Sequence, residues 1–272
     1  MNAPSSTLPS AAPPAKGRGA HIIAVTSGKG GVGKTFISAN LSAALARLGH
    51  RVLVVDADLG LANLDVVLNL QPKTTLHDVF SGKASLDAAL LPAPGGFDVL
   101  LAGSGLVEYS RLTPEVREQL VQVLHSVRPR YDHVLIDTGA GISDVVLHAV
   151  SLADDVLIVA TPEPTSLADA YATIKVLAMQ QGRRNMLITV NQVSRNGEGR
   201  GVAQQLQTVV DRFVKLPDNQ AVKLRYVGEI PSDKTVREAV QRRQLLMQTF
   251  PGCSAAQAIT QVATKVEEAI RA

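Results

Sequence analysis

The stretch Gly-Lys-Gly-Gly-Val-Gly-Lys-Thr, residues 28–35, decides the fold of this chain. It matches G-x-x-x-x-G-K-[ST] at every fixed position, which is the pattern of a loop that wraps around phosphate groups. The apolar run before it, residues 21–26, is typical of a buried parallel strand, and residues 34–48 are typical of a helix. A helix that begins directly after the loop presents its N-terminus to an anion. We therefore predict a phosphate-binding loop, rather than a glycine-rich turn that happens to be followed by Lys-Thr.

Each residue type in this loop has a physical reason to be there. Glycines let backbone N–H groups converge on a phosphate because no Cβ atom intervenes. The glycines expected to do so are Gly28, Gly30, Gly31 and Gly33. Lys34 is expected to reach the β- and γ-phosphates, which also makes it a catalytic candidate, and the Thr35 hydroxyl is expected to ligate Mg²⁺. Val32 and Phe36 complete the set of loop residues expected to bind the nucleotide.

The rest of the chain alternates short apolar runs with amphipathic stretches. The predicted strands are 21–26, 51–56, 97–102, 133–137, 155–160, 186–191 and 225–228. The predicted helices are 34–48, 114–127, 142–152, 165–181, 200–215, 232–242 and 254–271. This alternation predicts an α/β fold, a single-domain, doubly wound, mostly parallel sheet with helices on both faces. Ligands bind such sheets at the carboxyl ends of the strands.

Composition narrows the class of protein. Residues 1–20, rich in Ala, Pro and Ser, are expected to be a disordered tail, and residues 21–272 the P-loop domain. The single cysteine, Cys253, indicates a reducing cytosol and leaves too few thiolates for an iron–sulfur cluster. The net charge of +3 comes without a dense Lys/Arg tract, so it does not favour nucleic acid. No apolar run is long enough to predict a membrane-spanning helix.

Two more predicted strands end in carboxylates. The strand 51–56 leads into Asp56-Ala57-Asp58, and the strand 133–137 ends at Asp137 before Thr-Gly-Ala-Gly. Buried carboxylates are costly unless they meet a cation, water or substrate, so both places are candidates for the phosphate site. Asp137 is expected to hold Mg²⁺ through a water, with the glycine-rich turn sensing the γ-phosphate. The alternative is that Asp56 caps the turn after its strand and Asp137 caps the helix 142–152.

The lysine after the first glycine, Lys29, gives the loop the form KGGxGK[ST], which resembles the MinD/ParA family of P-loop ATPases. The resemblance implies that Lys29 reaches across a dimer interface to the nucleotide of the other subunit. It also implies that Asp58 positions the attacking water and that Asp56 lies near the metal. The alternative for Lys29 is a solvated loop lysine.

The resemblance also bears on the base. It implies that Asn191 and the Ile-Pro turn at Pro231 lie against adenine. Guanine-specific P-loop proteins commonly carry N-K-x-D after a late strand, whereas residues 191–194 here are Asn-Gln-Val-Ser. The expected ligands are therefore ATP, in preference to GTP, and Mg²⁺.

Two longer stretches resemble the FlhG subfamily of flagellar regulators, also called FleN or YlxH. They are Asp-Ala-Asp-Leu-Gly-Leu-Ala-Asn-Leu-Asp-Val-Val-Leu (56–68) and Thr-Pro-Glu-Pro-Thr-Ser-Leu-Ala-Asp-Ala-Tyr-Ala-Thr-Ile-Lys (161–175). The resemblance implies a homodimer that forms with ATP, hydrolyses it slowly, and regulates flagellar number or placement through partners such as an FlhF-like GTPase. The tail lacks the Asp-Gln-Ala-x-x-Leu-Arg helix with which that subfamily stimulates the GTPase, which leaves such stimulation open.

The C-terminal helix 254–271 bears on location. Its apolar residues are small and its charges balance, which favours packing on the core over insertion into lipid. A cytoplasmic protein is expected, with peripheral contact at the inner face of the cell membrane as the alternative.

Two other functions stay open at this point. A ParA-like DNA-partition ATPase would bind DNA non-specifically as an ATP dimer, with Arg237, Arg242 and Arg243 as the candidate contact. A nucleotide-gated scaffold would bind ATP without turning it over. His133 and His148 are expected to be structural, because no pair of histidines has metal-ligand spacing.

Overall fold

The computed structural model describes residues 19–59, 63–103, 113–217 and 220–271. An eight-stranded sheet has the order β3-β4-β2-β5-β1-β6-β7-β8, and every pair is parallel except β3 with β4. The strands are β1 (His21–Thr26), β2 (Val52–Ala57), β3 (Leu90–Ala93), β4 (Phe97–Leu100), β5 (His133–Thr138), β6 (Asp155–Ala160), β7 (Asn185–Val193) and β8 (Lys223–Pro231).

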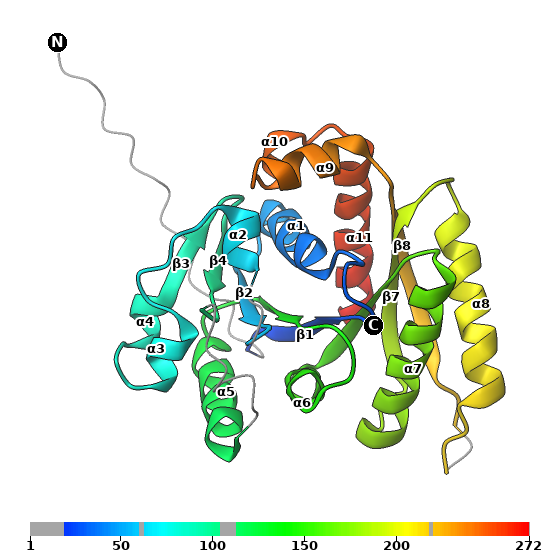
Figure 1. Cartoon of the computed structure of the whole chain (residues 1–272), viewed down its shortest axis with the longest axis horizontal. Coiled ribbons are helices and arrows are strands. Elements are labelled where there is room, and N and C mark those ends of the chain that lie inside the picture. The colour runs from blue at the N-terminus through cyan, green and yellow to red at the C-terminus, as the bar shows by residue number, and fades with distance from the viewer. Residues whose placement is uncertain (1–18, 60–62, 104–112, 218–219, 272) are drawn as a thin grey trace.

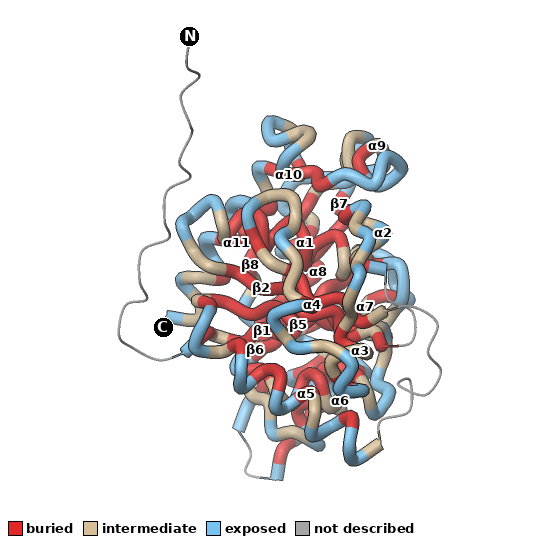
Figure 2. The backbone as a smooth tube through the Cα atoms, turned by 90° about the vertical axis from the view of Figure 1, so that its left-hand side faces the viewer, coloured by how far each residue is buried: buried red, intermediate tan, exposed pale blue. Residues whose placement is uncertain are grey.

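Helices cover both faces of this sheet (Figure 1). One face carries α3 (Leu76–Phe80), α4 (Leu86–Ala89), α5 (Pro114–Val127), α6 (Asp144–Ser151), α7 (Pro164–Gln181) and α8 (Glu198–Phe213). The other face carries α1 (Lys34–Arg47), α2 (Leu64–Leu68), α9 (Lys234–Gln241), α10 (Leu246–Thr249) and α11 (Ser254–Arg271). Because both faces are covered, β2 and β5 are buried along their whole length, as Figure 2 shows for the centre of the molecule. The predicted α/β fold is confirmed.

Most predicted elements lie within three residues of the observed bounds, but some elements were missed. The structure adds the edge strand β3, antiparallel to β4, and the short helices α2, α3, α4 and α10. None of these short elements spans enough residues to show a period in the sequence, and Pro92 within β3 argues locally against a strand.

The predicted tail, residues 1–20, falls almost entirely outside the described residues. Ala20, its last residue, is 1% exposed, and its N–H donates to the carbonyl oxygen of Arg128 at 2.6 Å. Ala20 therefore belongs to the packed structure.

The C-terminal helix α11 packs on the core, as expected. Its residues Ile259, Val262 and Val266 are at most 1% exposed and join the apolar layer that also contains α1. A Cβ atom at Gly228 of β8, where φ is 144°, would stand 2.7 Å from Val262, so the helix lies directly against the sheet. Among the described residues, no helix is long and apolar enough to cross a membrane.

Removing the side chain of Ile259 tests this packing. We expect Ile259→Ala to lower the free energy of unfolding by about 2–5 kcal/mol, because it leaves a cavity in a fully buried layer. Ile142→Ala removes the same atoms from a side chain that is 45% exposed, and it should cost less than about 0.5 kcal/mol. Denaturant titration measures both. Equal losses would mean that α11 is not anchored as the structure shows.

Candidate functional site

The loop 28–35 joins β1 to α1 at the carboxyl edge of the sheet, and its shape requires glycine at three places, one of them Gly31, whose φ is 80°. Gly33 has φ of 96°, and a Cβ atom there would lie 2.5 Å from Nδ2 of Asn191. A Cβ atom on Gly28 would lie 2.1 Å from the carbonyl oxygen of Asp169 in α7. The loop is therefore packed between β7 and α7. A glycine loop of this kind lets backbone N–H groups converge on an anion.

Lys34 is a buried cation at the base of this loop. Lys34 is 8% exposed, and its Nζ donates a hydrogen bond to Oγ of Ser27 at 3.1 Å. Burial lowers the pKa of Lys34, and the charges of Asp137 and Asp58 partly oppose that shift. A buried ammonium group is stabilised by nearby negative charges, and the phosphates of a nucleotide would add such charges.

Thr35 and Asp137 meet next to this lysine. Asp137, 2% exposed, accepts hydrogen bonds from the Thr35 hydroxyl and, at 2.8 Å, from Oγ of Ser38. Burial raises the pKa of Asp137 to about 6, while these two hydroxyls and Lys34 lower it. A hydroxyl and a carboxylate held together are the ligand types that Mg²⁺ takes in proteins. The predicted pair Thr35 and Asp137 is thus assembled.

Asp56 lies beside Asp137 on the neighbouring strand, at the same register position. Its Oδ1 accepts from the N–H of Asp58 at 3.1 Å, whereas its Oδ2 is buried with no partner among the described residues. Burial, together with the charge of Asp137, raises its pKa well above the usual range. An unpartnered buried carboxylate oxygen next to Thr35 and Asp137 fits a nearby cation or its water shell. These residues therefore suit Mg²⁺, although Asp56 itself does not line the cleft.

Asp58 faces the glycine-rich turn after β5. Its Oδ1 would be 3.4 Å from a Cβ atom on Gly139, and both residues line the same cleft as Lys34 and Thr35. The N–H of Gly141 donates to the carbonyl oxygen of Ser27 at 2.9 Å, which ties this turn to the phosphate-binding loop. The glycine-rich turn predicted to sense the γ-phosphate thus lies beside Asp58 and the phosphate-binding loop.

The cleft has a volume of about 1320 Å³ and extends from the loop to α9. Predicted residues that line it are Gly30, Gly31, Gly33, Lys34, Thr35, Phe36, Asp58, Asn191 and Pro231. Predicted residues outside its lining are Gly28, Lys29, Val32, Asp56 and Asp137. Asn191 and Pro231 both line the cleft, and their contact with adenine stays a prediction.

Asn191 also has a role that its sequence position does not reveal. It is 5% exposed, and its Nδ2 donates to the carbonyl oxygen of Val32 at 2.8 Å. Gln192, directly after it, has a positive φ of 60° and also lines the cleft. The end of β7 therefore braces the phosphate-binding loop from the side.

Lys29 points away from its own cleft. Its Nζ lies 2.8 Å from Oε2 of Glu163 and 2.9 Å from Oγ1 of Thr165, at the start of α7. This position at the rim is compatible with a role toward a second subunit and gives Lys29 no contact with the cleft of its own subunit. Its predicted reach across a dimer interface stays a prediction.

Several residues around the site were not predicted. Ser27 and Ser38 hold Lys34 and Asp137, Glu163 holds Lys29, and Lys234 and Arg237 of α9 border the cleft. Ser27 adjoins the glycine loop and could have been found there. The others are brought in by tertiary packing.

Comparison with known proteins agrees with this geometry. Residues 20–190 match the family model described as an AAA domain. The chain is 44% identical over 247 residues to the antiactivator FleN of Pseudomonas aeruginosa, covering 91% of this chain and 86% of that protein. It is 33% identical over 244 residues to the flagellum site-determining protein YlxH of Helicobacter pylori, covering 89% and 80%.

A solved structure is similar as well. The septum site-determining protein MinD of Pyrococcus horikoshii, complexed with Mg-ADP, matches with a TM-score of 0.75 at 28% identity, covering 92% of this chain and 97% of that one. From the loop, the carboxylates at the neighbouring strand ends and these similarities, we conclude that the chain belongs to the MinD/ParA family of P-loop ATPases, which includes FleN and YlxH.

Proposed function

We propose that this protein binds ATP with Mg²⁺ in the cleft, pairs with a second copy in that state, and hydrolyses the ATP to separate again. The observation that carries the proposal is the placement of Lys34, Thr35 and Asp58 around one cleft, with Asp137 directly behind Thr35. Each of these side chains matches one requirement of phosphoryl transfer: charge neutralisation, metal binding and orientation of the water.

The residues divide the work as follows. Lys34 binds the β- and γ-phosphates, while Thr35 and Asp137 would hold Mg²⁺, which would supply neutralisation of the phosphate charge. Asp58 orients a water in line with the bond to the γ-phosphate and accepts its proton. In the dimer, Lys29 gives up its ion pair with Glu163 and places a positive charge next to the nucleotide of the partner copy. Such switch proteins hydrolyse slowly until a partner completes the site.

For the cellular role, we propose the control of flagellar number or placement. The support is the similarity to FleN and to YlxH, a flagellum site-determining protein, along more than four fifths of this chain. The partners would be flagellar assembly or regulatory proteins, such as an FlhF-like GTPase, and the protein would act in the cytoplasm, with or without peripheral contact to the membrane.

The DNA-partition alternative has less support. The three arginines proposed for it do not form one free face, because Arg237 borders the nucleotide cleft and Arg242 pairs with Glu238 at 2.6 Å. The absence of salt-sensitive binding to arbitrary duplex DNA by the ATP-bound form would set this alternative aside.

The Asp58→Ala variant separates binding from hydrolysis. We expect it to bind ATP and Mg²⁺ as the wild type does, because Lys34, Thr35 and Asp137 are unchanged. Hydrolysis should fall by about two to four orders of magnitude, since the water loses its general base. Phosphate release and the mass in solution with ATP, ADP and no nucleotide measure the effects. The ATP form should accumulate with twice the monomer mass.

Two results would reject this role of Asp58. Loss of ATP binding would make it a structural or metal-holding residue. Normal hydrolysis would place the catalytic carboxylate elsewhere, with Asp56 the first to examine.

The Lys29→Ala variant tests the dimer contact. We expect it to bind ATP as a monomer with near-normal affinity, because Lys29 does not line its own cleft, and to lose ATP-dependent dimerisation and hydrolysis. Lys265→Ala removes an exposed lysine from α11 and serves as the matched control, with no expected change. Unchanged dimerisation and turnover in Lys29→Ala would show that Lys29 is an ordinary surface lysine paired with Glu163.

A further inference from the structure

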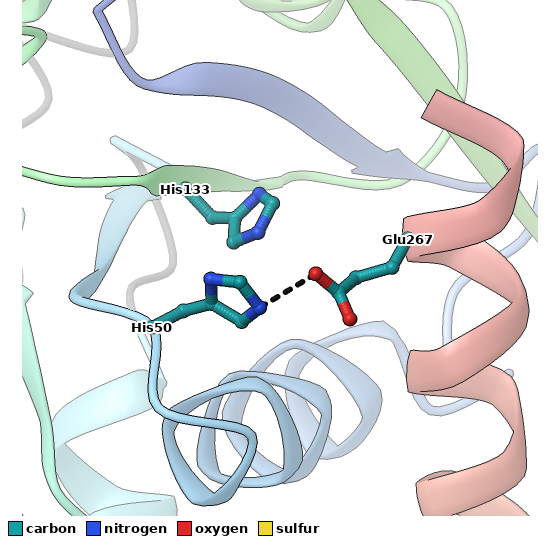
Figure 3. A group of neighbouring side chains, drawn as sticks. All are labelled: His50, His133 and Glu267. Atoms are coloured by element: carbon teal, nitrogen blue, oxygen red, sulfur yellow. Dashed lines mark ion pairs between the residues drawn. The ribbon is translucent and has the colours of Figure 1, made fainter. Parts of the chain in front are cut away.

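Three side chains from distant parts of the sequence converge on the side of α1 and α11 away from the phosphate-binding loop (Figure 3). They are His50, in the loop between α1 and β2; His133, the first residue of β5; and Glu267, near the end of α11. Nε2 of His50 lies 2.5 Å from Oε1 of Glu267, and the two imidazole rings stand 4.8 Å apart, edge to face. One ligand atom from each residue falls within 4.8 Å of the other two.

The ion pair between His50 and Glu267 does not explain why His133 is buried beside them. His133 is 6% exposed, and its buried Nδ1 has no hydrogen-bond partner among the described residues. A buried imidazole favours its neutral form, which keeps a nitrogen lone pair that can bind a metal ion. The pair His50–Glu267 accounts for two residues and leaves this buried imidazole with an unmet polar atom, which is costly.

The charged groups around the cluster are already paired. Asp132 binds Arg51 at 2.7 Å, and His21 binds Asp155 at 2.8 Å, so neither acid competes for a cation. Arg271 lies 2.7 Å from Glu267, but its side chain is 70% exposed and can turn into water. The side chains of His50 and Glu267 are 21% and 14% exposed, which leaves a narrow approach from solvent.

We propose that His50, His133 and Glu267 form a binding site for one first-row transition-metal dication, with Zn²⁺ the best match. Two imidazole nitrogens and one carboxylate oxygen are ligands that Zn²⁺ accepts, whereas Mg²⁺ and Ca²⁺ take oxygen atoms. Tetrahedral Zn²⁺ at about 2.0–2.2 Å from each ligand needs ligand atoms roughly 3.3 Å apart. Binding therefore requires the three side chains to rotate from a spacing of up to 4.8 Å, and it leaves the fourth position to a water.

This metal site is distinct from the Mg²⁺ residues of the nucleotide cleft. His133 begins β5 and Asp137 lies near its other end, so the two sites are separated by about 13 Å of extended strand. The metal joins α11 to the end of α1 and to the middle of the sheet. Because it binds the folded chain, it stabilises that chain and fastens the C-terminal helix.

Metal titration of the full-length protein tests the site. The nucleotide-free protein is stripped with a chelator, returned to buffer with excess Mg²⁺, and titrated with Co²⁺ and then with Zn²⁺. We expect a single equivalent of Co²⁺ with the strong visible bands of a tetrahedral centre, displaced by Zn²⁺. We also expect Zn²⁺ to raise the thermal unfolding midpoint.

Conservative variants assign the ligands. His50→Gln and Glu267→Gln keep size and polarity, and each should weaken Zn²⁺ binding by at least about 100-fold and abolish the thermal shift. His125→Gln alters an exposed histidine of α5 and should behave as the wild type. Metal-free unfolding and Mg-ATP binding verify that each variant is folded, so the test does not depend on a substitution at the buried His133.

Either of two results overturns the proposal. One is a wild-type protein that takes up no stoichiometric Co²⁺ or Zn²⁺ at micromolar metal. The other is metal binding, or a thermal shift, that persists in His50→Gln and Glu267→Gln, because the metal would then lie elsewhere.

Discussion

The burial of the Lys34 ammonium is the interaction on which the cleft depends. A cation that is 8% exposed must be balanced, and the chain does so with Asp58 and Asp137 at the ends of two neighbouring strands. Asp137 also lies beside the buried Asp56, and burial raises the pKa values of Asp56 and Asp137. A phosphate–Mg²⁺ unit placed among them supplies an anion to the lysine and a cation to the carboxylates. The site is therefore ordered in advance for that ligand.

The sheet determines where these groups can stand. β1 and β2 both pair with β5, so Ser27, Asp58 and Gly139 emerge at one edge within reach of each other. Asn191 of β7 secures the loop from the other side, and Gly33 makes the close approach possible. At the opposite end of β5, His133 lies close to His50 and to Glu267 of α11. The same strand therefore contacts both the phosphate-binding site and the C-terminal helix.

Local features of the sequence predicted much of this arrangement. A buried strand followed directly by glycines or by a carboxylate is a contiguous pattern that can be recognised in the sequence. This pattern identified the loop 28–35, Asp56, Asp58 and Asp137. The partners of Lys29 and Asn191 could not be predicted, since Glu163 and Val32 reach them only through packing of α7 and β7. The histidine cluster was missed for the same reason. His50, His133 and Glu267 have no mutual spacing in the chain, and His133 was expected to be only structural.

The most direct measurement of the central claim is the affinity of the Lys34→Ala variant for ATP in the presence of Mg²⁺, by titration calorimetry. The account predicts that binding is lost or nearly so, because no other described cation is buried at the base of the phosphate-binding loop. Circular dichroism and thermal unfolding confirm that the variant is folded, and Lys265→Ala, on exposed α11 surface, should bind as the wild type does. Near-wild-type ATP affinity in a folded Lys34→Ala protein would contradict the assignment of this cleft to nucleotide phosphates.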